Sequence, residues 1–174
     1  MRDGRAAFRG YVVVSGPPAS GKSSLAPALA TALDLPLLAK DVVKDALVDV
    51  LGAPDLPRSR ELGRAAVHVL LAVARTAGRG VLEGVWFDYA RAPLAALPGP
   101  LVEVFCRCPP DVLRARYAAR STARGAGWFD LDRDPDELWN VEVGTPVAGD
   151  WPVLEVDTSG EVDVAALAAR IVDA

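Results

Sequence analysis

Apolar residues recur along the chain with two alternating spacings, which predicts strands and helices in turn. Residues 11–14 form an apolar run rich in β-branched side chains, as expected of a strand buried on both faces of a parallel sheet. Residues 22–33 then carry leucines at four-residue spacing, which indicates a helix packed on that sheet. Pro27 inside this helix removes one backbone hydrogen bond and is expected to bend it. A short loop therefore joins the first strand to the first helix.

The same alternation continues to the end of the chain. Further strands are expected at residues 35–39, 81–86, 101–106 and 153–156, a loop at 52–59, and helices at 41–51, 61–77, 89–97, 109–120 and 162–172. Strands that alternate with helices imply an α/β fold of three layers, doubly wound around a parallel sheet of about five strands. Ligands of such sheets bind at the carboxyl ends of the strands, so residues that follow strands are the candidates for chemistry.

Composition and charge narrow the class of protein. The chain has 174 residues, 51% hydrophobic and 24% charged, which is an ordinary globular balance and suits one domain over residues 1–174. A formal net charge of -4 argues against general binding to nucleic acid or to acidic membranes. No run of about eighteen apolar residues occurs, and residues 1–5 contain no signal-peptide core, so a cytoplasmic protein is expected.

Cysteine and histidine are too scarce to form a metal site of their own. Cys106 and Cys108 are the two cysteines, and they lie too close in sequence for an ordinary disulfide framework. The one histidine, His68, lies far from them among apolar residues and is expected to be structural. We expect both cysteines to be structural thiols.

The loop between the first strand and the first helix carries the strongest motif. Residues 16–23, GPPASGKS, fit the spacing G-x-x-x-x-G-K-[ST] of a phosphate-binding loop. Glycines at both ends let backbone N–H groups turn inward around phosphates, and the helix N-terminus adds its positive dipole end. Lys22 is expected to reach the outer phosphates, and the hydroxyl of Ser23 to hold Mg²⁺. The residues expected to contact a nucleoside triphosphate here are Gly16, Ala19, Ser20, Gly21, Lys22, Ser23 and Ser24.

Asp41 and Lys44 follow the second strand and are one helical turn apart. Both are expected to face the crevice above the loop, where Asp41 would take a proton from an attacking hydroxyl and Lys44 would steady a phosphate or the base. The alternative is that Asp41 only caps the helix that follows and that Lys44 is a solvated surface residue.

The third strand and its end supply further candidates. Glu83 would lie near a metal if this strand borders the loop, and otherwise it faces outward. Trp86, Asp88 and Tyr89, together with Phe87, follow at the expected end of the strand. Aromatic faces and a carboxylate there suggest an acceptor pocket, with core packing of the aromatic residues as the alternative.

Arginines are concentrated in the helix expected at 109–120 and just after it. Arg116, Arg120 and Arg124 recur every four residues on one face, with Arg114 nearby. Like charges so arranged repel one another unless an anion lies between them, which favours a role at a triphosphate. A lid is expected around residues 116–134. Three further arginines, Arg58, Arg60 and Arg64, would either contact a phosphorylated substrate or be ordinary surface charge, and the second interpretation is favoured.

The loop, the pair Asp41 and Lys44, and the stretch from Cys108 to Arg120 together resemble the small P-loop kinases related to adenylate kinase. The resemblance spans nearly the whole chain, is strongest to the branch of chloramphenicol phosphotransferase and zeta-toxin-like kinases, and implies the P-loop nucleoside triphosphate hydrolase fold. It implies that Asp41 is the general base, that Arg116 contacts the nucleotide and that Arg120 is a lid arginine for the transferring phosphate. Residues 156–159, which include Thr158, resemble the loop that borders adenine in these kinases.

These observations lead to one hypothesis and two alternatives. The hypothesis is a phosphotransferase that uses ATP and Mg²⁺ to phosphorylate a hydroxyl of a small molecule, with Asp41, Lys22 and Arg120 as catalytic residues. The acceptor would contact Asp41, Lys44, Glu83, Trp86, Asp88 and Tyr89. The alternatives are a non-catalytic ATP-binding module that signals to a partner, and a polynucleotide 5′-hydroxyl kinase, which the acidic balance disfavours. No guanine motif is visible, so ATP is favoured over GTP; the sequence indicates neither the acceptor nor the oligomeric state.

Overall fold

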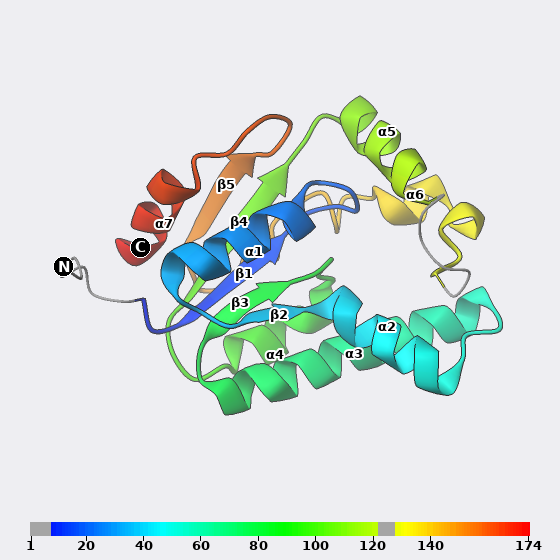
Figure 1. Ribbon diagram of the computed structural model, residues 1–174, viewed down its shortest axis with the longest axis horizontal. Helices are drawn as coiled ribbons and strands as arrows, with labels where there is room; N and C mark the ends of the chain where they lie inside the picture. Colours follow the sequence, from blue (N-terminus) through cyan, green and yellow to red (C-terminus); the bar gives the residue numbers. More distant parts are fainter. Residues whose placement is uncertain (1–7, 122–127) are drawn as a thin grey trace.

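The computed structural model describes residues 8–121 and 128–174. Within these residues the centre is a sheet of five parallel strands in the order β2-β3-β1-β4-β5, with the first strand of the chain in the middle (Figure 1). The strands are β1 (Tyr11–Ser15), β2 (Leu37–Ala39), β3 (Gly80–Glu83), β4 (Leu101–Arg107) and β5 (Val153–Asp157). The α/β fold with a parallel sheet, which the alternation of elements predicts, is confirmed.

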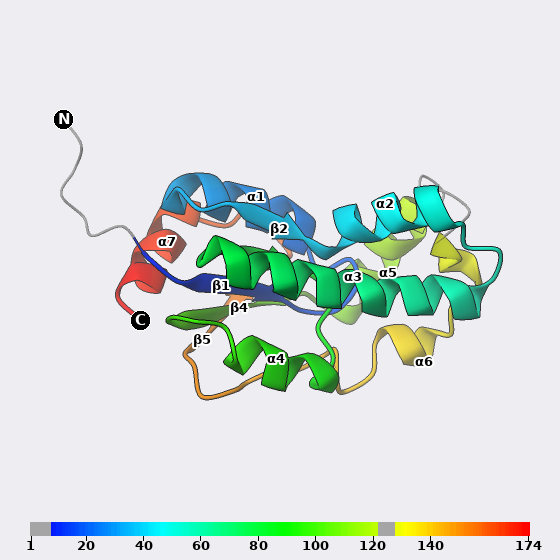
Figure 2. The same cartoon turned by 90° about the horizontal axis from the view of Figure 1, so that it is seen from below.

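Helices cover both faces of the sheet and also extend beyond its carboxyl edge. The longer helices are α1 (Lys22–Leu33), α2 (Lys40–Leu51), α3 (Leu56–Ala77), α5 (Pro110–Ser121) and α7 (Val164–Val172), and the short ones are η1 (Asp88–Ala90), α4 (Arg91–Ala95), η3 (Asp130–Asp132) and α6 (Pro135–Leu138). Figure 2 shows α1 and α7 on one face of the sheet and α4 on the other. The helices α2, α5 and α6 lie beyond the ends toward which the strands point (Figure 1).

Alternate residues of β1 face two separate apolar clusters. Val12 and Val14 pack with α1 and α7 on one face. Tyr11 and Val13 pack with α3 and α4 on the other, and all four side chains are fully buried. A buried valine stabilises the fold by about 1.5–3 kcal/mol. A central strand that is apolar on both faces therefore holds the two layers of helices on one sheet. In the described residues, no helix has the length and apolarity that a bilayer span requires.

Three local expectations differ from the structure. The third strand ends at Glu83, three residues before the expected end at residue 86. The helix α3 begins inside the loop expected at 52–59, because the carboxylate of Asp55 accepts a hydrogen bond from the backbone N of Arg58 (2.8 Å) and caps it. His68, which lies among apolar residues in the sequence, is on the exposed side of α3 and not in the core.

Glu103 of β4 is a fully buried carboxylate that joins two parts of the chain. Its Oε1 accepts hydrogen bonds from Ser15 Oγ (2.6 Å) and the backbone N of Val147 (2.8 Å). Its Oε2 accepts them from the backbone N of Ala148 (3.0 Å) and Trp151 Nε1 (3.1 Å). Four donors compensate the carboxylate for the water it has lost. The contact fixes the segment before β5 to the last residue of β1.

We predict that Glu103→Gln lowers the free energy of unfolding by about 2–4 kcal/mol. The amide N–H₂ of glutamine would face N–H or O–H donors whose hydrogen bonds a carboxylate oxygen now accepts. Urea titration followed by circular dichroism measures the change. The matched control is Glu155→Gln on the next strand, where the carboxylate makes an exposed ion pair with Arg107 (2.6 Å). This control is expected to lose less than about 1 kcal/mol. Equal losses in the two variants would contradict the anchoring role.

Candidate functional site

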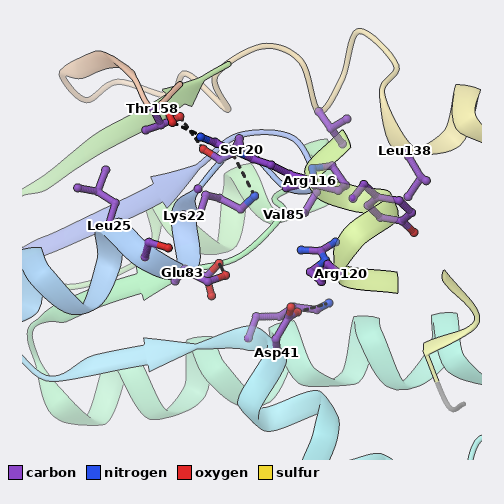
Figure 3. Close-up of a pocket in the computed structure, with 18 of the residues that line it drawn as sticks. Ser20, Lys22, Leu25, Asp41, Glu83, Val85, Arg116, Arg120, Leu138 and Thr158 are labelled. Atoms are coloured by element: carbon purple, nitrogen blue, oxygen red, sulfur yellow. Dashed lines mark hydrogen bonds and ion pairs between the residues drawn. The ribbon is translucent and has the colours of Figure 1, made fainter. Parts of the chain in front are cut away.

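A cavity of about 630 Å³ lies at the carboxyl ends of the central strands. Its walls come from segments that are far apart in the sequence, mainly residues 18–25, 40–41, 83–87, 116–120, 128–143 and 158–164. Figure 3 shows Lys22, Glu83, Asp41 and Arg120 around one space. The structure thus brings together the groups that the sequence singles out after β1, β2, β3 and β4.

The loop at residues 16–23, here called the P-loop, requires glycine at both ends. Gly16 and Gly21 have positive φ values of 130° and 88°, and Ala19 between them has a φ of 65°. A Cβ on Gly16 would lie 2.6 Å from the carbonyl oxygen of Cys106, and one on Gly21 would lie 3.3 Å from the Cβ of Thr158. The positive φ values and the tight packing both exclude larger residues at these two positions. All the P-loop residues predicted to contact a nucleotide line the cavity except Gly16, which forms the turn out of β1.

Lys22 is buried beneath the P-loop, with 5% of its surface exposed. Its Nζ donates to the carbonyl oxygens of Gly16 (2.9 Å) and Pro17 (2.7 Å). Burial lowers the pKa of Lys22 to about 8, and the nearby carboxylate of Glu83 opposes this shift. A polyanion that entered the cavity would favour the charged form of this lysine.

Glu83 points into the site, so the alternative that it faces outward is wrong. It is the last residue of β3 and lies opposite Val14 of the neighbouring strand β1. Its side chain is buried, and its Oε1 accepts a hydrogen bond from Ser23 Oγ (3.3 Å). Burial raises the pKa of Glu83, and Lys22 opposes the rise. A hydroxyl beside a carboxylate supplies the oxygen ligands that Mg²⁺ prefers.

The described residues contain no group of three or more His, Cys, Asp or Glu side chains that could hold a metal ion. A Mg²⁺ at Ser23 and Glu83 would therefore need further oxygen ligands from phosphates or water.

Asp41 lines the cavity from the first turn of α2. The helix begins at Lys40 with Ala39 as its N-cap, so the alternative that Asp41 caps the helix is wrong. Lys40 Nζ forms an ion pair with Asp41 Oδ1 at 3.2 Å, and the Asp41 side chain is 30% exposed. Asp41 is thus a partly exposed carboxylate that faces the P-loop across the cavity (Figure 3).

Arg116 and Arg120 line the cavity from α5. Arg116 donates to the carbonyl oxygens of Thr158 and Ser159, each at 3.0 Å. Thr158 Oγ1 donates a hydrogen bond to the carbonyl oxygen of Ser20 (2.6 Å). This hydrogen bond joins the P-loop to the loop after β5. The guanidinium of Arg120 lies 5.1 Å from the centre of the Tyr117 ring.

The other arginines of this helix do not form part of the described cavity wall. Arg114 is exposed and does not line the cavity. Arg124 lies outside the described residues, as does the part of the expected lid at residues 122–127.

Lys44 does not face the P-loop, and it is not solvated either, so both expectations for it are wrong. Only 1% of its surface is exposed, and its Nζ donates to Ser59 Oγ of α3 (2.8 Å). The same Nζ lies 3.9 Å from the centre of the Trp128 ring. The reason is that α2 runs away from the sheet alongside α3 (Figure 1), so one turn after Asp41 the side chain reaches α3.

The residues expected to form an acceptor pocket after β3 are only partly in place. Trp86 is buried in the core, and its Nε1 donates to the carbonyl oxygen of Val14 (3.1 Å). Asp88 and Tyr89 are exposed. None of these three lines the cavity, which corrects the expectation that they contact an acceptor. The strand ends three residues earlier than expected, so the residues after it turn in other directions.

Several lining residues were not singled out from the sequence. Among them are Lys40, Val85, Trp128, Arg133, Leu138 and Val143. Phe87, which was expected near the acceptor pocket, also lines the cavity. Trp128 could have been found, because a large aromatic residue in a polar, glycine-bearing segment needs a packing partner. The segment around Leu138 and Val143 carried no such signal, since its place depends on tertiary contacts.

The fold and the site together define a P-loop nucleotide-binding protein. A family model described as an AAA domain matches residues 12–132, a range that contains the P-loop, Asp41, Glu83 and the two cavity arginines of α5. The chain belongs to this family. No curated protein reaches a significant sequence match with the chain.

Solved structures resemble the whole chain. A protein from Chloroflexus aurantiacus J-10-fl, described as a candidate kinase, is 32% identical, with a TM-score of 0.80 over 93% of this chain and 96% of that one. A gluconokinase from Sinorhizobium meliloti 1021 is 19% identical, with a TM-score of 0.63 over 97% and 94% of the two chains. The Mycobacterium tuberculosis APS kinase in complex with AMPPNP and APS is 20% identical, with a TM-score of 0.59 over 95% and 96%.

These matches confirm the resemblance to small P-loop kinases and the expected fold. The more specific resemblance to the branch of chloramphenicol phosphotransferase and zeta-toxin-like kinases stays a prediction.

We predict that affinity for ADP is constant at neutral pH and falls once the pH exceeds about 8, the pKa of Lys22 in the free protein. Binding then requires Lys22 to take up a proton, which costs up to about tenfold in affinity per pH unit. Titration calorimetry in buffers of different ionisation enthalpy measures both the affinity and the proton uptake. Lys22→Met is expected to bind more weakly and without this pH dependence. An equally steep fall in Lys22→Met would assign the effect to another group.

Proposed function

We propose that the protein transfers the terminal phosphate of ATP to a hydroxyl group of a small molecule. One observation carries the proposal: a P-loop with its lysine and a partly exposed carboxylate, Asp41, open onto the same cavity from opposite sides (Figure 3). Membership of a P-loop kinase family supports the reaction type. Neighbours that are named a gluconokinase and an APS kinase are in line with a small acceptor.

The residues present fit ATP with Mg²⁺. Backbone N–H groups of the P-loop and the N-terminus of α1 would surround the phosphates, with Lys22 as their cation. Leu25, Val162 and Val164 give the other end of the cavity an apolar lining suited to a nucleobase, next to Arg116. Ser23 would hold Mg²⁺ and Glu83 would orient it or its water, and the bound ion would neutralise phosphate charge.

Asp41 is the candidate general base. In the proposed reaction its carboxylate accepts the proton of the acceptor hydroxyl while that oxygen bonds to the terminal phosphorus of ATP. The bond from this phosphorus to the bridging oxygen breaks, and ADP leaves. Lys22 and Arg120 would stabilise the negative charge on the phosphoryl group during transfer. Lys40, in its ion pair with Asp41, holds the carboxylate at the edge of the cavity.

The direct test uses ATP labelled at the terminal phosphate, Mg²⁺ and a panel of sugars, nucleosides and other small alcohols. The proposal requires that at least one acceptor becomes labelled with formation of ADP. ATP that binds tightly while no acceptor is ever labelled would contradict it and would favour a non-catalytic binding module.

Once an acceptor is known, we predict that Asp41→Asn lowers kcat by about 10²–10⁴-fold, because the amide cannot accept the proton of the hydroxyl. Affinity for ATP is expected to stay within about twofold, since the P-loop is untouched. Steady-state kinetics and nucleotide titration measure the two effects. Asp49→Asn, an exposed change on the same helix, is the matched control and is expected to keep full activity. An unchanged kcat in Asp41→Asn removes it as the base.

We also predict that Glu83→Gln raises the Mg²⁺ concentration needed for half-maximal activity by about 10–100-fold, because the amide no longer supports an ion at Ser23. Activity measured against Mg²⁺ at fixed total ATP tests this. Glu61→Gln on the surface of α3 is the control. A loss of kcat with an unchanged Mg²⁺ requirement would show that Glu83 does not act through the ion.

A further inference from the structure

The end of the cavity away from the nucleotide has an apolar wall. Val85 and Phe87 line it from the segment after β3, and Trp128, Leu138 and Val143 line it from the segment between α5 and β5. The last three are 8%, 8% and 3% exposed, so each is fixed by packing and not free to turn toward solvent. A purely polar acceptor would leave this wall without a partner.

Trp128 is held in place by the helix that carries Asp41. Its Nε1 donates to Asp45 Oδ1 of α2 at 2.7 Å. Its ring lies 3.9 Å from Lys44 Nζ and 5.4 Å from Lys40 Nζ, both on the same helix. Lys44 is itself fixed to α3 through Ser59. The indole therefore keeps a constant position relative to the candidate base, as a residue that selects substrates must.

Two cations of this wall, Lys40 and Arg133, form ion pairs with neighbouring carboxylates. Lys40 is paired with Asp41 at 3.2 Å, and Arg133 lies 3.6 Å from Glu137. Glu137 also accepts a hydrogen bond from Arg60 Nε at 3.1 Å.

A further carboxylate, that of Asp130, lines the same wall and accepts a hydrogen bond from the Tyr117 hydroxyl at 3.2 Å. Arg120 is the cation that the proposed function uses at the transferring phosphate. An acceptor carboxylate or phosphate would thus meet cations that are already paired, beside carboxylates that repel it.

We propose that the acceptor is an alcohol without net negative charge that places an aromatic or other apolar face against Trp128. Trp128 is then the specificity-determining residue of the acceptor site, and Lys44 and Asp45 position it. This inference rests on the proposed function and names the class of its substrate. Contact with the indole is expected to improve binding of an aryl acceptor by about two- to tenfold over a methyl one.

Matched acceptors test the charge and the apolar face separately. Phenyl β-D-glucoside, methyl β-D-glucoside and 4-carboxyphenyl β-D-glucoside carry the same hydroxyl groups. The methyl member lacks the aromatic face and the carboxyphenyl member adds a negative charge, and the same three forms can be built on ribose and on glycerol. The enzyme with Mg²⁺ and ATP is assayed for ADP formation, and the phosphate ester is identified by phosphorus NMR. The neutral aryl member of a set is expected to have the highest kcat/KM, at least about tenfold above the anionic member.

Variants of the segment around Trp128 test the residue itself. Trp128→Ala is expected to raise KM for aryl members to that of methyl members, with kcat and the KM for ATP unchanged. Trp128→Phe, which keeps an aromatic face, is expected to retain the preference and guards against misfolding of the alanine variant. Leu131→Ala, at a side chain that is 83% exposed in the same segment, is the control and is expected to behave as the unaltered protein.

The outcomes distinguish a failure of this inference from a failure of the proposed function. Preference for the anionic members, or an aryl preference that survives in Trp128→Ala, overturns the inference while leaving the phosphotransferase function intact. If ATP binds and no member of any charge is phosphorylated, the proposed function fails, and this inference fails with it.

Discussion

The register of the parallel sheet decides where every group of the site lies. Val14 of β1 is paired with Glu83 of β3, and Ser15 is paired with Phe105 of β4. The ends of β1 and β3 therefore lie within one residue of each other, and β4 continues two residues beyond the end of β1. Both faces of the sheet are covered by helices that pack apolar side chains on it. Only the carboxyl edge is left for polar chemistry, so the P-loop, the Glu83 carboxylate and the arginines of α5, the helix after β4, meet there.

Within that edge, charge is distributed unevenly. Lys22 and Arg116 are held by backbone carbonyl oxygens at the P-loop end, so their charge is not cancelled by an ion pair in the contacts that hold them. At the far end Lys40 and Arg133 lie beside carboxylates. Backbone dipoles can hold a cation and still leave it able to attract an anion, whereas an ion pair offers an incoming anion little net attraction. The P-loop end is therefore built for a polyanion, and the Asp41 end is not.

The same polar residue types play different parts depending on what packs against them. Lys44 and Asp41 are one helical turn apart, yet Asp41 reaches the cavity and Lys44 is enclosed between Ser59 and Trp128. Glu83 and Glu103 both come from buried strands, but Glu83 opens onto the cavity and Glu103 accepts four hydrogen bonds in the interior. A functional carboxylate is thus distinguished from a structural one by where the strand places it and by how many donors already satisfy it.

Local patterns in the sequence were sufficient for the order of strands and helices along the chain, the P-loop with its glycines and lysine, and the position of Asp41 just after the second strand. These features depend on spacing along a short segment, which the sequence states directly. Only the tertiary structure decided that β3 ends at Glu83, that Trp86 and Lys44 are buried, and that Trp128 and Leu138 close the cavity. Their places depend on contacts between segments many residues apart, and no local periodicity records which distant surface a side chain will meet.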